Sequence, residues 1–296
     1  MFALRRRPEL SVVVVCYDMQ RELPRTLRSL SSQYQKGMDG IGYEVLVVDN
    51  GSPIPVDPRE VAAIDSRFRV HRIDDALPSP AVAANSAVAM TTGKAVGLIL
   101  DGARMVTPGT LATGLRAMTT HPRPIVTPMA WHLGPAHQSV SVPAGYGPSA
   151  EDELLASIDW PRDGYRLFDI SVLAGANKQG FFGTINESCC LLLPRELWTE
   201  SDGLDERFDQ PAGGLVSIDL FTRLVELPGT ELIVLLGEGS FHQVHGGAST
   251  SPKAPQAAWA EHYKKLRGRA YKRPVVRPTY FGAMPEGARR FILPEG

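Results

Sequence analysis

Apolar and polar positions follow two different periods over the first hundred residues. Four apolar runs predict strands, and the first two are continuous and β-branched, as in strands that are covered on both faces. These runs lie at 10–16, 43–48, 69–73 and 95–100. Between them, Leu23, Leu27 and Leu30 recur at helical spacing, and the small residues of 81–94 predict a second helix. Strands and helices in strict alternation indicate an α/β fold with a mainly parallel sheet and helices on both faces.

The pattern is less regular in the second half of the chain. Residues 121–165 carry many Pro, Gly and His, which predicts long loops on the ligand side of the sheet. Residues 187–197 predict a buried strand followed by the start of a helix. Residues 217–227 predict an amphipathic helix with Ser217 as its N-cap, and 231–236 predict a further strand.

The last part of the chain, 251–296, is expected to be a basic appendage. Trp259, Tyr263 and Leu266 lie at i, i+4 and i+7, which predicts a helix packed on the body. Ten Lys or Arg stand against three Glu here, so this end could contact an anionic membrane surface or simply remain solvated. The whole chain has 31 Lys and Arg against 32 Asp and Glu, which argues against a nucleic-acid partner.

The cysteines and the apolar runs also indicate the cellular compartment in which the protein is expected. Cys16, Cys189 and Cys190 do not form a disulfide framework, so a reducing, cytoplasmic environment is expected. The basic start and first apolar run resemble a signal peptide but lack a small-residue cleavage site, and a buried strand is the better interpretation. No stretch approaches the roughly 18–20 apolar residues of a spanning helix.

Three acids lie at the carboxyl ends of predicted strands. Asp18 follows the first strand by two residues, Asp49 ends the second, and Asp101 ends the fourth. Ligands of parallel sheets bind at this edge, so the three together indicate a site for a cation or for sugar and base hydroxyl groups. Each acid alone is also explained as a turn or cap residue.

Several common sites of α/β proteins are missing from the sequence. No G-x-G-x-x-G follows the first strand, no G-x-x-x-x-G-K-[ST] occurs, and no G-x-S-x-G occurs. Dinucleotide-binding Rossmann sites, P-loop sites and α/β-hydrolase sites are therefore not expected.

An ordered set of segments from about Leu10 to Gly247 carries a family resemblance. The segments are "SVVVVCYDMQRELPRTLRSLSSQ", "EVLVVDNGS", "AANSAVAMTTGKAVGLILDGA", "CCLLLPRELWTESDGLDERF", "GGLVSIDLFTRL" and "FHQVHGG". In this order they resemble the family 2 glycosyltransferases, which have the GT-A fold. The resemblance implies a nucleotide-sugar-binding half (1–105), an acceptor-binding half of the same domain (106–250) and the appendage (251–296).

The resemblance also implies an activity and partners. It implies transfer of a sugar from a nucleoside diphosphate sugar to a hydroxyl group of a glycan or glycolipid acceptor, with inversion of the anomeric carbon. The implied setting is surface polysaccharide or glycolipid synthesis, with the active site in the cytoplasm or at the inner face of the membrane. The residues implied to bind the nucleotide are Cys16, Tyr17, Asp18, Asp49, Asn85, Asp101 and Gly102.

The chain departs from the family pattern at the metal site. The family's Asp-x-Asp is reduced to Asp101-Gly102-Ala103, and Ala103 cannot bind a metal. The resemblance implies that Asp101, with His245 and His242, binds Mn²⁺ or Mg²⁺ beside the diphosphate. The alternatives are that Arg104 neutralises Asp101, or that the histidines form ordinary loop hydrogen bonds.

A second departure affects the catalytic base. The acidic pair of the family falls on Val216 and Ser217, which leaves Asp219 as the predicted base and Glu187 as the reserve. Asp219 could equally pair with Arg223 at i+4. Two other functions therefore stay open. One is a catalytically silent GT-A module that binds nucleotide or glycan, and the other is a nucleotidyltransferase, which would bring a Gly-rich basic loop after the first strand.

Overall fold

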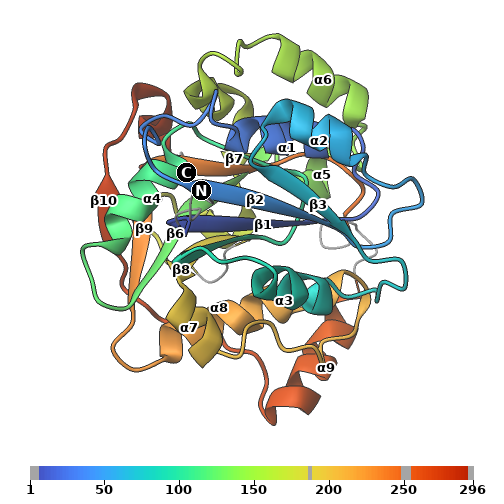
Figure 1. Ribbon diagram of the computed structural model, residues 1–296, viewed down its shortest axis with the longest axis vertical. Coiled ribbons are helices and arrows are strands. Elements are labelled where there is room, and N and C mark those ends of the chain that lie inside the picture. Colours follow the sequence, from blue (N-terminus) through green and yellow to red (C-terminus); the bar gives the residue numbers. More distant parts are fainter. Residues whose placement is uncertain (1–6, 186–188, 248–254, 293–296) are drawn as a thin grey trace, which may run out of the picture.

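The computed structural model describes residues 7–185, 189–247 and 255–292. Its ten-stranded sheet has the main order β10-β9-β6-β8-β4-β1-β2-β3, and β5 and β7 pair with β9 and β6 (Figure 1). The strands are β1 (Leu10–Cys16), β2 (Tyr43–Asp49), β3 (Phe68–Arg72), β4 (Ala95–Ile99), β5 (Arg104–Val106), β6 (Pro124–Leu133), β7 (Ser171–Leu173), β8 (Cys190–Pro194), β9 (Glu231–His242) and β10 (Thr279–Gly282).

The sheet is mainly parallel, as predicted. β1 pairs in parallel with β2 and β4, and β3 extends the same parallel block. β8 runs antiparallel to β4 and joins this block to β6, which in turn pairs in parallel with β9. The carboxyl ends of β1, β2 and β4 therefore meet at one edge of the sheet.

Side chains alternate between the two faces of each buried strand. In β1, Val12 and Val14 pack into one apolar cluster, whereas Val13 and Val15 pack into the other. Helices contribute to both clusters and so cover both faces of the sheet (Figure 1). The first cluster includes residues of α1 (Leu23–Leu30), α2 (Pro58–Ile64) and α4 (Thr110–Met118), and the second includes residues of α3 (Ala81–Ala89), α7 (Arg195–Glu200) and α8 (Val216–Glu226).

The prediction of long loops over 121–165 is wrong. This stretch contains β6, which lies between β9 and β8 in the middle of the sheet. The strand was not predicted because it contains Pro124 and Pro128. Proline cannot donate a hydrogen bond to a neighbouring strand and is rare in central strands. The structure accommodates Pro128 at a register shift between Pro128 and Met129.

Two short helices follow β6 and lead to a 3₁₀ segment. They are α5 (Gln138–Ser141) and α6 (Pro148–Ala156), and the segment is η1 (Gly164–Ile170). In Figure 1, α6 lies outside the layer formed by α1 and α2. The stretch therefore forms a cover near the ligand edge rather than an irregular loop.

Two predicted boundaries also change. β9 was expected to end at residue 236, but it continues to His242 past Gly237, which has a φ of 73°. α8 begins at Val216 after Leu215, so Ser217 is inside the helix and is not its N-cap.

The tail packs on the body through α9 (Gln256–Arg267), where Trp259 and Tyr263 are buried as predicted. The remaining 3₁₀ segments are η2 (Gly175–Asn177), η3 (Pro211–Gly213) and η5 (Glu286–Phe291). Among the helices of the described ranges, none is both long enough and apolar enough to cross a membrane.

Candidate functional site

Asp101 lies two residues beyond β4, at the ligand edge of the sheet. Its Oδ1 accepts a hydrogen bond from the Ala103 backbone N–H at 3.0 Å, which fixes the turn after the strand. Its Oδ2 lies 2.8 Å from Nε2 of His242 and 3.5 Å from Nε2 of His245. The two Nε2 atoms are 3.1 Å apart. The three residues predicted to bind the metal therefore do converge.

β9 and the residues after it bring the histidines to Asp101. His242 is the last residue of β9 and lies opposite Arg104 of the short strand β5. The backbone N–H of Gln243 then donates to the carbonyl of Ala103 at 2.9 Å. His245 follows two residues later, so both imidazoles are held beside the turn that carries Asp101.

Gln138 of α5 fixes the orientation of the His242 ring. Its Nε2 donates to the backbone carbonyl of His242 at 3.0 Å, so its Oε1 faces Nδ1 of the same residue at 2.6 Å. Because an amide oxygen only accepts, the proton of a neutral His242 lies on Nδ1. The lone pair on Nε2 therefore points toward Asp101.

The two histidines have different protonation tendencies. Burial lowers the pKa of His242 to about 4, and Asp101 only partly offsets this. Burial acts in the same direction on His245, but there the Asp101 carboxylate outweighs it and the pKa is raised. Burial disfavours an ionised Asp101, yet His245 and His242 together hold its pKa well below the usual range. At neutral pH, Asp101 is therefore a carboxylate and His242 is a neutral imidazole.

This arrangement has an excess of acceptor atoms. A protonated His245 has one hydrogen on Nε2, and that hydrogen can serve either His242 or Asp101, not both. Nε2 of His242 and Oδ2 of Asp101 then face each other at 2.8 Å without a hydrogen between them. A divalent cation among the three atoms, which all lie within 4.8 Å of one another, would remove this repulsion. One carboxylate and two imidazoles fit Mn²⁺ better than Mg²⁺, which prefers oxygen ligands.

Asp49 ends β2 and has no exposed surface. Its oxygens accept hydrogen bonds from the backbone N–H groups of Ser52 at 2.9 Å and Val56 at 3.1 Å, and Oδ2 lies 2.7 Å from Nη1 of Arg72. Burial raises the pKa of Asp49, but the hydrogen bonds from Ser52, Val56 and Arg72 outweigh it and the pKa is lowered. Its observed contacts fix the turn after β2, and direct contact with a nucleotide stays a prediction.

The loop after β1 is more accessible. Tyr17 is 54% exposed, and Asp18 is exposed with a φ of 54°. The backbone N–H of Asp18 donates to Oγ of Ser52 at 2.9 Å, which ties this loop to the turn after β2. These two side chains are the predicted nucleotide residues that are open to solvent at the edge of the sheet.

Cys16 and Gly102 are buried where the two strands end. A Cβ on Gly102 would lie 2.7 Å from Cβ of Cys16, so the turn after β4 can approach β1 only with glycine there. Burial raises the pKa of the Cys16 thiol strongly, and it therefore remains neutral. Both residues therefore shape the backbone at this edge, and their contact with a nucleotide stays a prediction.

Asn85 and Asp219 have their polar atoms occupied by other parts of the protein. Asn85 on α3 donates to the carbonyl of Leu204 at 2.8 Å and accepts from its N–H at 3.0 Å. The Asp219 carboxylate, which is buried, pairs with Arg223 at 2.8 Å and with Arg267 of α9 at 2.5 Å. The structure does not bring either side chain into contact with the Asp101 cluster, and Glu187 lies outside the described residues. The role of Asp219 as a base stays a prediction.

Sequence reasoning missed three polar residues next to the cluster. They are Gln138, Glu151 and Arg21, which lie in a stretch expected to be loop or in the turn before α1. No local pattern marks a buried glutamine or glutamate that supports another residue. Only the tertiary structure shows which backbone groups they contact.

Comparison with known proteins agrees with this fold. Residues 11–135 match the family model described as glycosyl transferase family 2. The structure of S. aureus TarS 1–349 in complex with UDP aligns with a TM-score of 0.51 and 13% identity, over 88% of this chain and 71% of that chain. A longer S. aureus TarS structure gives a TM-score of 0.52 and 13% identity over 88% of this chain, but only 43% of that chain is covered.

A second solved enzyme has the same fold and a bound metal. The mannosyltransferase PcManGT from Pyrobaculum calidifontis, in complex with GDP-Man and Mn²⁺, aligns with a TM-score of 0.50 and 18% identity, over 91% of this chain and 67% of that chain. No curated protein sequence matches the chain significantly. The match to the glycosyl transferase family 2 model thus covers residues 11–135, and the fold of the chain is similar to that of the two solved glycosyltransferases.

Proposed function

We propose that the chain transfers a sugar from a nucleoside diphosphate sugar to an acceptor hydroxyl group with inversion of the anomeric carbon. The observation that carries this proposal is the convergence of Asp101, His242 and His245 at the carboxyl ends of the parallel strands. The UDP bound to TarS and the GDP-Man bound to PcManGT support the class of donor. The acceptor, a glycan or glycolipid of surface polysaccharide synthesis, rests on the family alone.

We assign the three clustered residues to a divalent cation, with Mn²⁺ as the best match to their donor atoms. When bound, the cation would stabilise the negative charge that develops on the diphosphate as the sugar leaves. Asp101 supplies the carboxylate for this site despite the loss of the second acid at Ala103. The Mn²⁺ in the PcManGT complex supports the choice of metal.

The exposed loop after β1 is assigned to the nucleoside. The aromatic ring of Tyr17 offers a stacking surface for a base, and Asp18 offers acceptors for hydroxyl groups. Asp49 supports this part of the site by fixing the turn from Ser52 to Val56, whose position sets that of Asp18.

The candidate catalytic base, Asp219, is already paired with two arginines. Asp219 can accept a proton from the acceptor only after Arg223 or Arg267 moves away from its carboxylate. This occupied state favours one alternative, a module that binds nucleotide without transferring the sugar. Release of nucleoside diphosphate from a donor sugar distinguishes the two, since a silent module releases none.

A thermal-shift panel tests the proposal. UDP, GDP, dTDP and CMP are each added with and without Mn²⁺, and the activated donor of the preferred base is then incubated with the protein. A nucleotide at 100 times its dissociation constant stabilises the fold by about 2.7 kcal/mol. Stabilisation by one nucleoside diphosphate, together with slow release of that diphosphate from its sugar donor, is expected. Stabilisation without any release would support the silent module, and no stabilisation by any nucleotide would contradict the proposal.

A further inference from the structure

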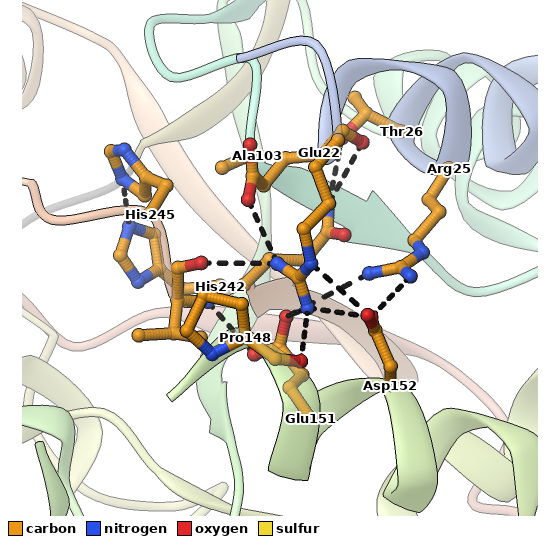
Figure 2. Close-up of polar contacts among 12 residues, drawn as sticks. Glu22, Arg25, Thr26, Ala103, Pro148, Glu151, Asp152, His242 and His245 are labelled. Carbon is orange, nitrogen blue, oxygen red and sulfur yellow. Dashed lines mark hydrogen bonds and ion pairs between the residues drawn. The ribbon is translucent and has the colours of Figure 1, made fainter. Parts of the chain in front are cut away.

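One stretch between β6 and η1 supplies polar contacts behind both histidines. It contains α5 and α6, and its Gln138 and Glu151 contact the His242 ring and the backbone N–H of Val244. Figure 2 shows Glu151 and Asp152 on α6 facing Glu22 and Arg25, with His242 and His245 beside this network. Both Gln138 and Glu151 are buried, at 1% and 0% exposure.

Gln138 holds His242 at two points. The donor and acceptor ends of one amide bind the backbone carbonyl and the ring Nδ1 of the same residue. The backbone contact determines which end of the amide faces the ring, and the ring contact then determines which nitrogen is protonated. In solution, neutral histidine has no such constraint, so this tautomer depends on the protein.

Glu151 and Arg21 hold the backbone of Val244, the residue before His245. Oε2 of Glu151 accepts a hydrogen bond from the backbone N–H of Val244 at 2.8 Å. Nη1 of Arg21 donates to the carbonyl oxygen of Val244 at 3.2 Å, and Nη2 of Arg21 lies 3.1 Å from Oε1 of Glu151. The Val244 residue is therefore bonded at both its N–H and its carbonyl, which limits where His245 can lie.

Asp152 is a natural control for Glu151. It is the next residue of α6, and its Oδ1 lies 2.7 Å from Nη2 of Arg21 and 2.5 Å from Nη2 of Arg25. It thus shares the arginine contact of Glu151, but its carboxylate has no hydrogen bond to Val244. Its side chain is 46% exposed, whereas that of Glu151 is fully buried.

We infer that Gln138 and Glu151 are positioning residues that orient His242 and His245 toward Asp101 for cation binding. Gln138 sets the tautomer of His242, and Glu151, together with Arg21, sets the backbone that carries His245. The inference rests on the proposed metal-dependent transfer. Residues that orient metal-ligating histidines in this way commonly contribute about 10- to 100-fold to metal affinity.

Nitrogen NMR of the imidazole rings in the metal-free protein tests the role of Gln138. The seven histidines are distinguished by comparison with His242→Gln, which removes one set of signals. We expect His242 to be protonated on Nδ1 in the unmodified chain and in Gln138→Glu, which keeps an acceptor oxygen. Gln138→Leu should move the proton toward Nε2. A His242 protonated on Nε2 in the unmodified chain, or an unchanged tautomer in Gln138→Leu, would overturn the role of Gln138.

The affinity for Mn²⁺, measured by calorimetric titration, tests the role of Glu151. Glu151→Ala is expected to weaken Mn²⁺ binding about 10- to 100-fold. Glu151→Gln, whose amide oxygen can still accept from Val244, should recover most of the affinity. Asp152→Asn should bind Mn²⁺ as the unmodified chain does. Equal affinities for Glu151→Ala and Asp152→Asn would overturn the role of Glu151.

The two readouts separate this inference from the proposed function. If the unmodified chain does not bind Mn²⁺, the metal-dependent function and the role of Glu151 both fail. The tautomer measurement still decides the role of Gln138, because it requires no metal. If the unmodified chain binds Mn²⁺ and the variants do not differ, the proposed function stands and the positioning roles fail.

Discussion

Nε2 of His242 and Oδ2 of Asp101 approach to 2.8 Å although neither of these two atoms carries a hydrogen at neutral pH. The cause is a chain of contacts from Gln138 through the His242 ring, which leaves Nε2 as an acceptor. His245 is the one member of the cluster whose pKa is raised. In the absence of a cation, a proton on His245 would offset the Asp101 charge.

The first prediction concerns the titration of His245. In the metal-free protein we expect NMR to give a pKa for His245 above the ordinary histidine value of 6.5. The stability from this pair is present below pH 6.5 and is lost as the pH rises through the raised value. In Asp101→Asn the pKa of His245 should fall, because burial remains and the opposite charge is removed. An unchanged His245 pKa in Asp101→Asn would show that another group raises it, and exposed histidines serve as internal controls.

The second prediction concerns Glu151. Burial raises its pKa to about 7, and the hydrogen bonds from Val244 and Arg21 only partly offset this. Because the folded state retains its proton longer than the unfolded state, the stability of the fold should fall as the pH rises from about 4.5 to about 7. The loss attributable to Glu151 is about 3 kcal/mol at most.

Urea unfolding at pH 5 and pH 8 measures this effect. Glu151→Gln cannot ionise, so its stability should change less between the two pH values than that of the unmodified chain. Asp152→Asn should keep the full change. If Glu151→Gln shows the same pH dependence as the unmodified chain, the raised pKa of Glu151 is not its source.

At the scale of elements, one ion network connects α8, α9 and the loop before α8. Asp219 on α8 pairs with Arg223 of the same helix and with Arg267 near the end of α9, and Arg267 also lies 2.8 Å from Asp205. Arg223 and Arg267 also line a cavity of about 720 Å³ that Asn85 borders. The network therefore attaches the tail helix α9 to α8 and to the loop that carries Asp205.

The third prediction separates the structural role of this network from a catalytic one. Asp219→Asn and Arg267→Gln break the same buried pair, so each should lower the free energy of unfolding by about 3 kcal/mol. Only Asp219→Asn removes the carboxylate. If Asp219 is the base, Asp219→Asn should lose about 10²- to 10⁴-fold in transfer rate, beyond the loss in Arg267→Gln.

Sugar transfer by the two variants is compared at a temperature where both are folded. Nucleotide affinity is measured alongside as a control and should not change in either variant. Equal transfer rates for Asp219→Asn and Arg267→Gln would leave Asp219 with a structural role, and Glu187 would be the next candidate.

On the scale of the whole molecule, the sequence predicted the elements whose signals are local. β1, β2 and β4 are continuous apolar runs, and α1 and α8 have helical apolar periods, so their existence and the parallel block followed from the pattern. β6 was not predicted because prolines are unusual in a central strand. The antiparallel pairing of β8 with β4 was not predicted because it depends on contacts between distant parts of the sequence. Hydrophobic periodicity identifies single elements, whereas strand order depends on how the elements pack.

Some residues of the candidate site were also predicted from the sequence, and others were not. Asp101, His242 and His245 were predicted through the order of family motifs, and the structure brings them together. Asp49 and Asn85 were predicted with them, but their observed partners are in neighbouring turns and loops. Gln138 and Glu151 could not be predicted, because their contacts join the cluster to a cover that the sequence pattern did not reveal.

In the proposed function, a divalent cation on Asp101, His242 and His245 binds together with the nucleoside diphosphate. Calorimetric titration with the preferred nucleotide, first in the presence of Mn²⁺ and then with excess chelator, tests this most directly. We predict that Mn²⁺ tightens nucleotide binding by at least about tenfold, that chelation reverses this, and that Asp101→Asn abolishes the Mn²⁺ effect without changing metal-free affinity. Identical nucleotide affinity with Mn²⁺, with chelator and in Asp101→Asn would contradict the claim.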